Sequence, residues 1–511
     1  MNLKTPPTLD LGFEPHALYY GDCLEVMQFW PSESVDTIYG DPPFNSEATY
    51  SILWGQDTGK QSAQLEAFTD MWYWGPEAEK RLKTLLRPEH PAEPVIRAVL
   101  TYPGRSGMLS YLTYMAERLT EMRRILKPTG TLYLHCDATA NHYLKMLLDC
   151  IFGPQNFRGE IVWFKGYRGT PRKSRYQQAH ETVLFYTKSD AYTWNDVFGE
   201  YRDTDLKRYN KIDEDGNRYA LVKRRRANGE VYYGKTYPKG KLQGDVIDVP
   251  VLASTSKERL GYPTQKPLAL LEILLKASSN EGDIVLDPFC GCGTTIEAGL
   301  KLGRQVIGID ISVFALDVIN NVRFAGKYPP LPIKGIPTDF DSAERLAQTN
   351  PFEFQKWAVW QIGMMPSVKQ TNDGGIDGKG MLLNKPVVTS GRGEGQALAL
   401  RDSESEWTEF AYAQVKGGKS RSYVTEVEAF CHVLNDNNAA CGVFITLRPI
   451  GKRSRVHSVA ERLGSIAIGN ATYPRLQFWS IQEFYAHGTR PHLPPLVDPY
   501  KDRTAQTRLN L

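Results

Sequence analysis

The stretch that decides the fold is DIVLDPFCGCGTTIEAGLKLGRQVIGIDIS, residues 283–312. It reads as a buried strand, a glycine loop, a helix and a second strand that ends in an acid. Gly291 and Gly293 let the backbone pass close to a ligand, because glycine has no Cβ to collide with it. Asp310 follows about 20 residues after the first strand, where a carboxylate can accept both hydroxyls of a ribose. The pattern predicts an α/β sheet whose glycine loop binds a nucleoside.

The spacing of this loop narrows the choice of ligand. It is not the G-x-G-x-x-G pattern of dinucleotide sites, and nothing in it calls for a pyrophosphate. It therefore fits a nucleoside without a phosphate chain, such as S-adenosylmethionine. A tight strand-to-helix turn with incidental glycines is the structural alternative. Cys290 and Cys292 are two close thiols without a second pair, which argues against zinc.

Length, charge and cysteine content set outer limits on the protein. The 511 residues predict roughly three domains, and a net charge of +3 means that any attraction to nucleic acid must come from local patches. The sequence shows neither a long apolar run nor a secretory signal, so we expect no membrane contact. The seven cysteines are scattered and odd in number, which indicates reduced thiols and a cytoplasmic location.

Four regions differ in texture along the chain. Up to about residue 164, β-like and helical runs alternate, as in an α/β sheet covered on both faces. Inside this region, 77–105 is rich in proline and charge and is expected to be an inserted loop. Residues 165–260 are polar, basic and rich in tyrosine. An α/β texture returns until a proline-rich link at 328–339, and a new α/β pattern follows it.

A second motif, DTIYGDPPFN at residues 36–45, places an acid, two prolines and an aromatic directly after an apolar run. Taken alone it reads equally well as a plain loop, because prolines stop strands and aspartate starts turns. The other motifs of the chain decide between a turn and a site.

Three motifs together resemble the amino-directed DNA methyltransferases. They are DPPF at 41–44, YPTQKP at 262–267 and DPFCGCGTT at 287–295. Their order, with the catalytic motif first and the cofactor motif last, matches the β arrangement of that family. The resemblance implies a Rossmann-like, S-adenosylmethionine-dependent α/β domain over 1–335. It also implies that 165–260 is an inserted target-recognition region that contacts double-stranded DNA.

The resemblance gives DPPF a chemical role. The exocyclic amine of adenine is a poor nucleophile, because its lone pair is delocalised into the ring. Asp41 and the carbonyl of Pro42 can accept its two hydrogens, and Pro42 and Pro43 hold both acceptors rigidly. Phe44 can stack on a base turned out of the duplex. An aspartate at the first position favours N6 of adenine, with N4 of cytosine as the close alternative.

The resemblance also implies a cofactor site built from several loops. Its members are Asp22, Lys266, Asp287, Phe289, Gly291, Gly293 and Asp310. Asp22 is expected near the adenine moiety, Lys266 at the methionine end and Asp287 near the cofactor amine. His135 is expected to be a structural strand residue, because the reaction needs no strong base.

The basic middle region is the natural candidate for reading DNA sequence. Lys223 and the run Arg224, Arg225 and Arg226 could neutralise phosphates, while tyrosines and Asn228 could meet bases or sugars. The alternative is a solvated, charged loop.

The C-terminal part resembles the Mrr-like group of PD-(D/E)xK nucleases. Asp377 follows a glycine turn, a later strand carries Gln414 and Lys416 as Q-x-K, and Glu353 on a preceding helix adds an acid. The resemblance implies a restriction-endonuclease-like α/β domain; it spans 346–490, between a linker at 336–345 and a tail at 491–511. Mg²⁺ would be held by Glu353, Asp377 and Gln414, and Lys416 would orient water. Gln414 stands where most such nucleases carry an acid.

These motifs lead to alternative functions. The first is a site-specific adenine methyltransferase fused to an endonuclease, of restriction–modification type. The second is a methyltransferase, acting on N6-adenine or N4-cytosine, with a non-cutting DNA-binding module. A non-catalytic DNA-binding protein is the third, and RNA or protein could replace DNA as acceptor. Whether the chain forms a homodimer is left open.

Overall fold

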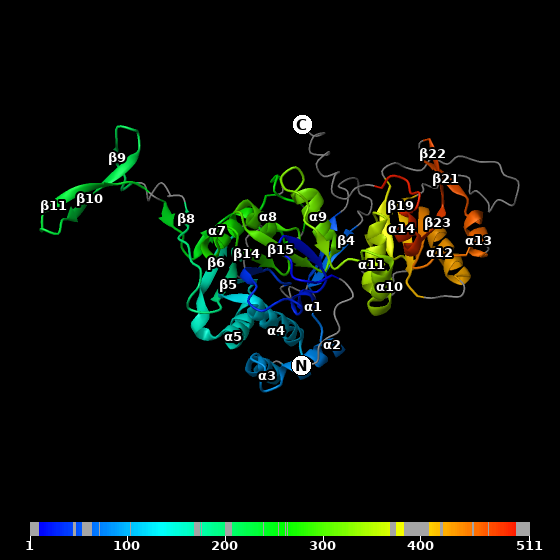
Figure 1. Ribbon diagram of the computed structural model, residues 1–511, viewed down its shortest axis with the longest axis horizontal. Coiled ribbons are helices and arrows are strands. Elements are labelled where there is room, and N and C mark those ends of the chain that lie inside the picture. Colours follow the sequence, from blue (N-terminus) through cyan, green and yellow to red (C-terminus); the bar gives the residue numbers. More distant parts are fainter. Residues whose placement is uncertain are drawn as a thin grey trace.

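The computed structural model describes residues 10–43, 48–53, 64–70, 72–102, 104–167, 174, 176–199, 207–238, 240–253, 255–260, 262, 264–367, 375–382, 408–418, 423–451, 454–468 and 470–496. Two α/β sheets form its two main bodies, and a narrow β-structure extends from the larger one (Figure 1). Within these described ranges, no helix is both long and apolar enough to cross a membrane.

The larger sheet has nine strands in the described residues, in the order β13-β6-β7-β5-β2-β14-β15-β1-β16. Its strands are β1 (Ala17–Tyr20), β2 (Val35–Gly40), β5 (Leu126–Cys136), β6 (Phe157–Phe164), β7 (His180–Thr187), β13 (Val246–Asp248), β14 (Ile284–Asp287), β15 (Gln305–Asp310) and β16 (Ile333–Lys334). Strand β7 runs antiparallel between β5 and β6, and the other pairs are parallel. Near-continuous apolar runs such as those of β1 and β14 are typical of strands buried on both faces.

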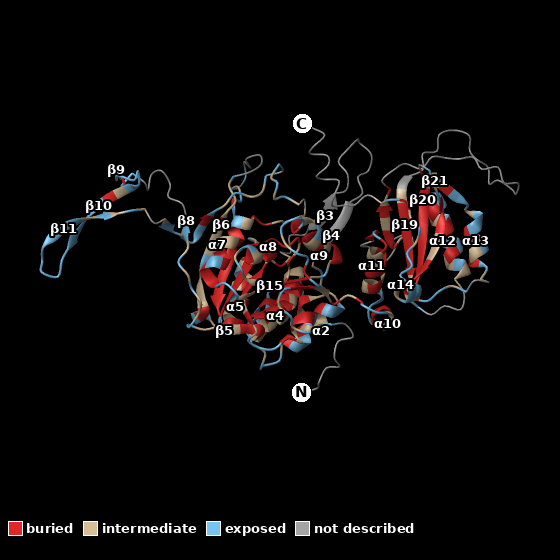
Figure 2. Cartoon of the chain, turned by 45° about the horizontal axis from the view of Figure 1, so that its top comes forward, coloured by how far each residue is buried: buried red, intermediate tan, exposed pale blue. Residues whose placement is uncertain are grey.

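Helices cover both faces of this sheet, as Figure 2 shows by the buried layer between them. They are α1 (Cys23–Met27), α2 (Pro76–Leu85), α3 (Glu93–Thr101), α4 (Gly107–Ile125), α5 (Asn141–Phe152), α7 (Leu268–Ser278), α8 (Thr294–Lys301) and α9 (Val313–Val318). Leu286 of β14 packs with the first five helices, whereas its neighbour Val285 packs with α7 and α8. This alternation follows from the two-residue period of a strand. The predicted α/β sheet covered on both faces is confirmed.

The prediction of an inserted loop at 77–105 was wrong, because this stretch forms α2 and α3. Proline stands in the first turn of both helices, where its missing N–H costs no hydrogen bond. The apolar residues Val95, Ile96 and Val99 are buried against the core.

The smaller sheet has the order β17-β18-β19-β20-β23 in the described residues. These strands are β17 (Met365–Pro366), β18 (Gly378–Met381), β19 (Thr408–Lys416), β20 (Ala439–Thr446) and β23 (Leu476–Ser480). Helices α10 (Phe340–Thr349), α11 (Pro351–Gln361) and α14 (Ile481–His487) pack on one face, and α12 (Val424–Asp436) and α13 (Val456–Arg462) pack on the other. A small hairpin of β21 (Ser465–Ile468) and β22 (Ala471–Pro474) completes this body.

Helix α10 begins inside the predicted linker at 336–345. Asp339 caps it by accepting a hydrogen bond from Ser342 N at 2.7 Å, in a capping box that starts the helix at Phe340. Ala343 and Leu346 then join the core of the smaller sheet. The connecting segment is therefore shorter than the composition of the sequence suggested.

The two bodies share a buried contact. Tyr20, at the end of β1, donates a hydrogen bond to the carboxylate of Glu353 on α11. Met365 of the smaller sheet lies in the same apolar cluster as Tyr20 and Phe314. A strand of the larger sheet is thus connected directly to the first turn of a helix that covers the smaller one.

We expect the change Tyr20→Phe to weaken this connection. Tyr20 is 5% exposed, and removing its hydroxyl leaves a carboxylate oxygen of the partly exposed Glu353 with one donor fewer. Loss of a hydrogen bond to a charged group costs about 1.5–3 kcal/mol. Denaturant unfolding of the full chain measures the loss, with Tyr102→Phe as control at a tyrosine that is 84% exposed. Equal midpoints for the two variants would contradict the expected role of the contact.

Candidate active site

The carboxyl ends of four neighbouring strands, β2, β14, β15 and β1, lie along one edge of the larger sheet. In α/β sheets, ligands bind outside this edge, where the chain leaves neighbouring strands in different directions. The loops after β2 and β14 are in contact, because a Cβ placed on Gly40 would lie 3.8 Å from Pro288 and 3.9 Å from Phe289. The structure thus brings the DPPF and DPF motifs, far apart in sequence, side by side.

The glycine loop after β14 has a backbone conformation that residues with a side chain rarely adopt. Gly291 and Gly293 have φ of +47° and +77°, in the left-handed region that favours glycine. A Cβ on Gly293 would lie 2.6 Å from the side chain of Ile319. Cys290 N donates to the carbonyl of Ile309 at 2.9 Å, which fixes the loop beside β15.

The two thiols of this loop are structural. Cys290 and Cys292 are buried, and burial raises the pKa of the Cys290 thiol well above its usual value. Arg323, itself buried, donates to the carbonyl of Cys292 and to Glu297 at 2.7 Å. Among the described residues, no three histidine, cysteine, aspartate or glutamate side chains gather to hold a metal. The guanidinium of Arg323 therefore braces the loop against α8.

Asp310 and Asp287 place two carboxyl groups beside the glycine loop. Asp310 accepts hydrogen bonds from Gly291 N and Ser312 N, both at 2.8 Å, and Asp287 accepts one from Phe289 N at 3.0 Å. Burial, together with the charges of Asp41 and Asp310, raises the pKa of Asp287 to about 7. Burial also raises the pKa of Asp310 to about 6. Both groups keep lone pairs that a ligand's hydroxyl or amine can use.

Asp41, at the end of β2, has two differently used carboxylate oxygens. Its Oδ2 accepts from Lys266 Nζ at 2.6 Å, and Lys266 is only 6% exposed. Its Oδ1 is buried and has no hydrogen-bond partner among the described residues. Pro42 is buried beside it and Pro43 partly so, whereas Phe44 lies outside the described residues. A buried acceptor that the protein leaves open is costly unless a ligand fills it.

Behind Lys266 lies a buried polar network that the motifs did not reveal. Glu181, on β7, lies 3.9 Å from Lys266 Nζ, bonds His135 Nε2 at 2.8 Å and accepts from Lys165 Nζ at 2.7 Å. His135 Nδ1 in turn bonds the hydroxyl of Tyr39 at 2.8 Å. Burial alone would raise the pKa of the Glu181 carboxyl, but Lys266 and the other partners hold it well below its usual range.

The segment that carries Lys266 is pinned in a strained conformation. Thr264 has φ of +61°, which is uncommon for a β-branched residue and is found at sites where the surroundings enforce it. Gln265 fixes the segment by accepting from Leu260 N at 2.8 Å and donating to the carbonyl of Glu258 at 2.7 Å. The ammonium of Lys266 is thereby positioned before any ligand arrives.

Asp22 lies at the start of α1, next to β1. Its Oδ1 accepts from Leu24 N at 2.8 Å as the helix cap, and its Oδ2 is paired with Arg118 of α4. Arg118 stacks on Tyr114, with its guanidinium 3.2 Å from the ring centroid. The sequence motifs pointed to Asp22 but not to Arg118, which orients it.

The C-terminal candidates lie around the smaller sheet. Asp377 Oδ2 accepts from Val415 N at 2.7 Å, and its Oδ1 accepts from Gln355 of α11. Gln414, next to Val415, is 7% exposed, and its Oε1 has no partner among the described residues. Lys416 follows on the same face of β19, because side chains alternate along a strand.

Glu353 is not part of this group. Its two oxygens are engaged by Tyr20 and by Lys356, the latter at 2.8 Å. The α11 residue that reaches Asp377 is Gln355, two positions further along the helix. Glu353 is thus bonded to residues other than Asp377 and Gln414, the two further members of the predicted metal-binding set.

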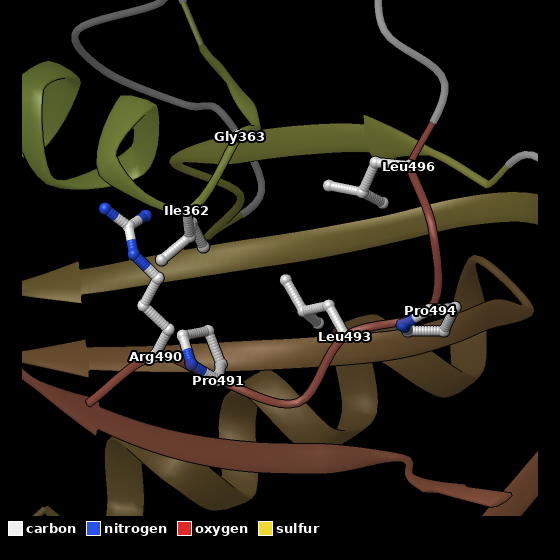
Figure 3. A pocket seen from close by; sticks show the side chains of 7 residues that line it. All are labelled: Ile362, Gly363, Arg490, Pro491, Leu493, Pro494 and Leu496. Atoms are coloured by element: carbon white, nitrogen blue, oxygen red, sulfur yellow. The ribbon is translucent and has the colours of Figure 1, made fainter. Parts of the chain in front are cut away.

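A separate hollow of about 270 Å³ opens between the end of α11 and the C-terminal segment (Figure 3). It is lined by Ile362, Gly363, Arg490, Pro491, Leu493, Pro494 and Leu496. Arg490 donates to the carbonyl of Gln361 and lies 5.2 Å from the Phe484 ring, so its charge is already engaged. None of the lining residues offers a carboxylate, an imidazole or a thiol. The lining therefore contains no candidate metal ligand, general base or nucleophile.

The fold and the loops at its carboxyl edge define a Rossmann-like α/β protein with a polar site above the sheet. Residues 35–321 match the DNA methylase family of N6 and N4 methyltransferases, and the chain belongs to that family. The resemblance of the motifs to amino-directed DNA methyltransferases is thereby confirmed at the level of the family.

Several curated proteins are similar to this chain. Type II methyltransferase M.EcaI of Enterobacter cloacae is 32% identical over 43% of this chain and 59% of its own length. DNA adenine methyltransferase YhdJ of Escherichia coli K12 is 26% identical over 59% of this chain and 80% of its own. Type II methyltransferase M.BamHI of Bacillus amyloliquefaciens is 29% identical over 59% and 55%. The chain thus spans just over half of two of these relatives.

Solved structures are similar at lower identity. An M1.HpyAVI–SAM complex is 19% identical and aligns over 60% of this chain and 97% of its own, with a TM-score of 0.33. PvuII DNA methyltransferase (cytosine-N4-specific) is 14% identical and aligns over 59% and 84%, with a TM-score of 0.35.

The raised pKa of Asp287 predicts a pH-dependent stability. The carboxyl pKa rises from about 3.9 in an unfolded chain to about 7 in the folded protein, so the folded state holds the proton more tightly. This contribution is fully present below about pH 4 and is lost as the pH rises through about 7, which amounts to roughly 4 kcal/mol.

Denaturant unfolding of the wild type and of Asp287→Asn, from about pH 4 to about pH 8, measures the effect. The stability of the wild type relative to the variant should fall across that window, whereas Asp245→Asn, at an exposed aspartate, should follow the wild type throughout. Parallel pH profiles for the wild type and Asp287→Asn would refute the assignment.

Proposed function

We propose that this chain is a site-specific methyltransferase that moves a methyl group from S-adenosylmethionine to N6 of adenine in duplex DNA. Membership of the DNA methylase family supports the reaction class. The observation that carries the proposal is Asp41, whose Oδ2 is fixed by Lys266 while its buried Oδ1 is left without a partner among the described residues. An acceptor held in this way suits an amine that arrives with the substrate.

The residues at the carboxyl edge fit the proposed cofactor. The positive φ of Gly291 and Gly293 brings backbone, and not side chains, to the ligand side of the loop. Asp310 keeps lone pairs for ribose hydroxyls, and Asp287 and Asp22 offer carboxylates to the two ends of the molecule, with Phe289 as an apolar neighbour. When bound, S-adenosylmethionine supplies a methyl group on a sulfonium, which is already a good donor.

The chain's own contribution is to position and activate the amine. Asp41 Oδ1 and the carbonyl of Pro42 accept the two amine hydrogens, which draws the nitrogen toward a tetrahedral, reactive state. The prolines keep both acceptors rigid. Alignment of this kind can lower the barrier by about 7–11 kcal/mol. The surplus proton leaves to water after transfer, so neither His135 nor Glu181 has to act as a strong base.

Reaching the amine requires the base to leave the duplex. Extrusion costs a few kcal/mol, and stacking on an aromatic side chain returns roughly 1–3 kcal/mol. Phe44 follows the catalytic loop directly in sequence and is the proposed stacking partner. The aspartate at position 41 and the similarity to an adenine methyltransferase of Escherichia coli both favour adenine over cytosine.

The test is a search for the methylated base. The purified chain is incubated with mixed-sequence plasmid DNA and S-adenosylmethionine, and the DNA is digested to nucleosides for mass spectrometry. We expect N6-methyladenine from the wild type and a loss of at least about 100-fold in Asp41→Ala, because the amine then loses a positioned acceptor. Asp245→Ala is the control at an exposed aspartate. N4-methylcytosine would overturn the choice of base, and no methylated base would overturn the proposal.

For the smaller α/β body we propose Mg²⁺-dependent DNA cleavage, which makes the chain a restriction–modification enzyme that spares methylated DNA. The buried Oε1 of Gln414, next to the Val415 that bonds Asp377, supports this. It has no partner among the described residues, and Mg²⁺ prefers oxygen ligands. Asp377 and Gln414 would hold the ion and Lys416 would orient water. A methyltransferase with a non-cutting module is the second candidate. It is favoured by Gln355, which occupies the other oxygen of Asp377 and contributes no charge.

Lys416→Ala distinguishes the two candidates. If the body cuts DNA, the variant should lose Mg²⁺-dependent cleavage of unmethylated plasmid by at least about 100-fold while N6-methylation continues. Lys83→Ala, at an exposed lysine of α2, should retain both activities. Gel analysis of the plasmid with and without Mg²⁺ gives the readout. Absence of cleavage by the wild type itself, on plasmid that it methylates, would support the non-cutting module.

A further inference from the structure

A β-ribbon extends from the larger body and is largely exposed on both sides (Figures 1 and 2). It consists of β10 (Arg218–Arg225) and β11 (Val231–Thr236), joined by a turn at 226–230, with β9 (Lys211–Ile212) paired to the start of β10. The short pair β8 (Phe198–Gly199) and β12 (Lys241–Leu242) lies between the ribbon and β13 of the larger sheet. An isolated ribbon of this size is only marginally stable in water. Its exposed side chains are therefore candidates for contact with a binding partner.

Charge is distributed unevenly along the ribbon. Between Arg218 and Thr236 the sequence has six lysines and arginines and one acid, Glu230. The cations concentrate at 223–226, next to the turn that joins β10 and β11. The acids Asp213, Glu214 and Asp215 lie at the opposite end, in the turn after β9. The end with the joining turn is therefore suited to approach a polyanion first.

The two faces of the ribbon are not equivalent. Side chains alternate along each strand, and the register pairs Lys223 with Tyr233 and Arg225 with Val231 on one face. On the other face, Arg224 is paired with Tyr232. Lys223, Arg225 and Tyr233 are all exposed, and Tyr233 is 63% so.

The cations of the second face are already engaged within the protein. Arg224 donates to the hydroxyl of Thr236 at 3.1 Å and lies across Gly234. Arg226 is paired with Glu230 at 3.1 Å and lies over the ring of Tyr232. By contrast, the side chains of Lys223 and Arg225 form no hydrogen bond or ion pair with any residue that the structure describes. Lys235 lies on the same face, over the ring of Tyr219 at 4.9 Å. The first face, which we call the open face, therefore presents two cations that no described residue engages.

We propose that the β10–β11 ribbon enters the major groove of duplex DNA with its open face, Lys223, Arg225 and Tyr233, toward the nucleic acid. The major groove is about 12 Å wide and admits a two-stranded β-ribbon. Strands that rise about 3.3 Å per residue give β10 a reach of roughly 26 Å along that groove. Lys223 and Arg225 contact phosphates or base edges, and Tyr233 contacts bases or sugars. The inference rests on the proposed function, because it assumes that duplex DNA is the substrate.

The test compares two double variants of the full chain that remove the same charge. Lys223→Gln with Arg225→Gln changes the open face, and Arg224→Gln with Arg226→Gln changes the opposite face. Binding to mixed-sequence linear duplex DNA is measured at several salt concentrations. The open-face variant should bind at least about tenfold more weakly, and its slope of log K against log salt should be reduced by about 1.8 for two lost phosphate contacts. The opposite-face variant should change by less than about threefold.

Measuring methyl transfer distinguishes a failure of this inference from a failure of the proposed function on which it rests. The open-face variant should raise the KM for DNA and leave kcat within about twofold, since its residues are not in the site. Thermal unfolding of both variants should match the wild type, because all four side chains are exposed. Equal losses for the two faces, or a loss confined to Arg224 and Arg226, would overturn the orientation while the wild type still methylates. A wild type that neither binds nor methylates duplex DNA would overturn both.

Discussion

The ion pair between Lys266 and Asp41 is the constraint on which the rest of the site depends. A buried carboxylate is costly unless it is paired, yet in the proposed reaction Asp41 needs one oxygen for the substrate amine. Lys266 fixes Oδ2, and Oδ1 has no partner in the part of the chain that the structure describes. Lys266 in turn needs Glu181, and Glu181 needs His135, because each buried charge requires a partner. The network joins β2, β5 and β7, so the antiparallel strand contributes to the site as well as to the sheet.

The order of the motifs along the chain becomes unimportant once the sheet has formed. The DPPF loop follows β2 and the glycine loop follows β14, with more than half of the larger body between them in sequence. Because β2 and β14 are parallel neighbours, both loops leave the sheet at the same edge. Tyr20 lies at the same edge, at the end of β1, and donates a hydrogen bond to Glu353 on α11. The same helix contacts Asp377 through Gln355. Helix α11 therefore connects the candidate site of the larger sheet with Asp377 of the smaller body.

Local motifs predicted the loops well, because a glycine at positive φ or a proline after a strand leaves its mark on the sequence itself. Contacts between residues far apart in the sequence were harder to predict. Glu181 is the one acid of strand β7, and Arg118 is a cation at a buried position of α4. Either departure from the pattern could have indicated a buried pair, but only the fold shows with which residue. The sequence predicts Glu353 as the acid of α11 in the metal-binding set. Glu353 faces Tyr20 instead, whereas Gln355 faces Asp377. Residues two positions apart on a helix point in nearly opposite directions, so the two side chains cannot both reach Asp377.

The network also bears on the proposed reaction, in which a positioned acceptor acts without a strong base. A base would have to hold an unpaired charge or a poised proton beside the amine, and Glu181 and His135 are bound to each other instead. Their partners hold the pKa of Glu181 well below its usual range, so it stays ionised and serves as a fixed counter-charge for Lys266. Lys266 in turn fixes the carboxylate of Asp41. In the proposed reaction, this arrangement of charges therefore favours placement of the amine over proton abstraction.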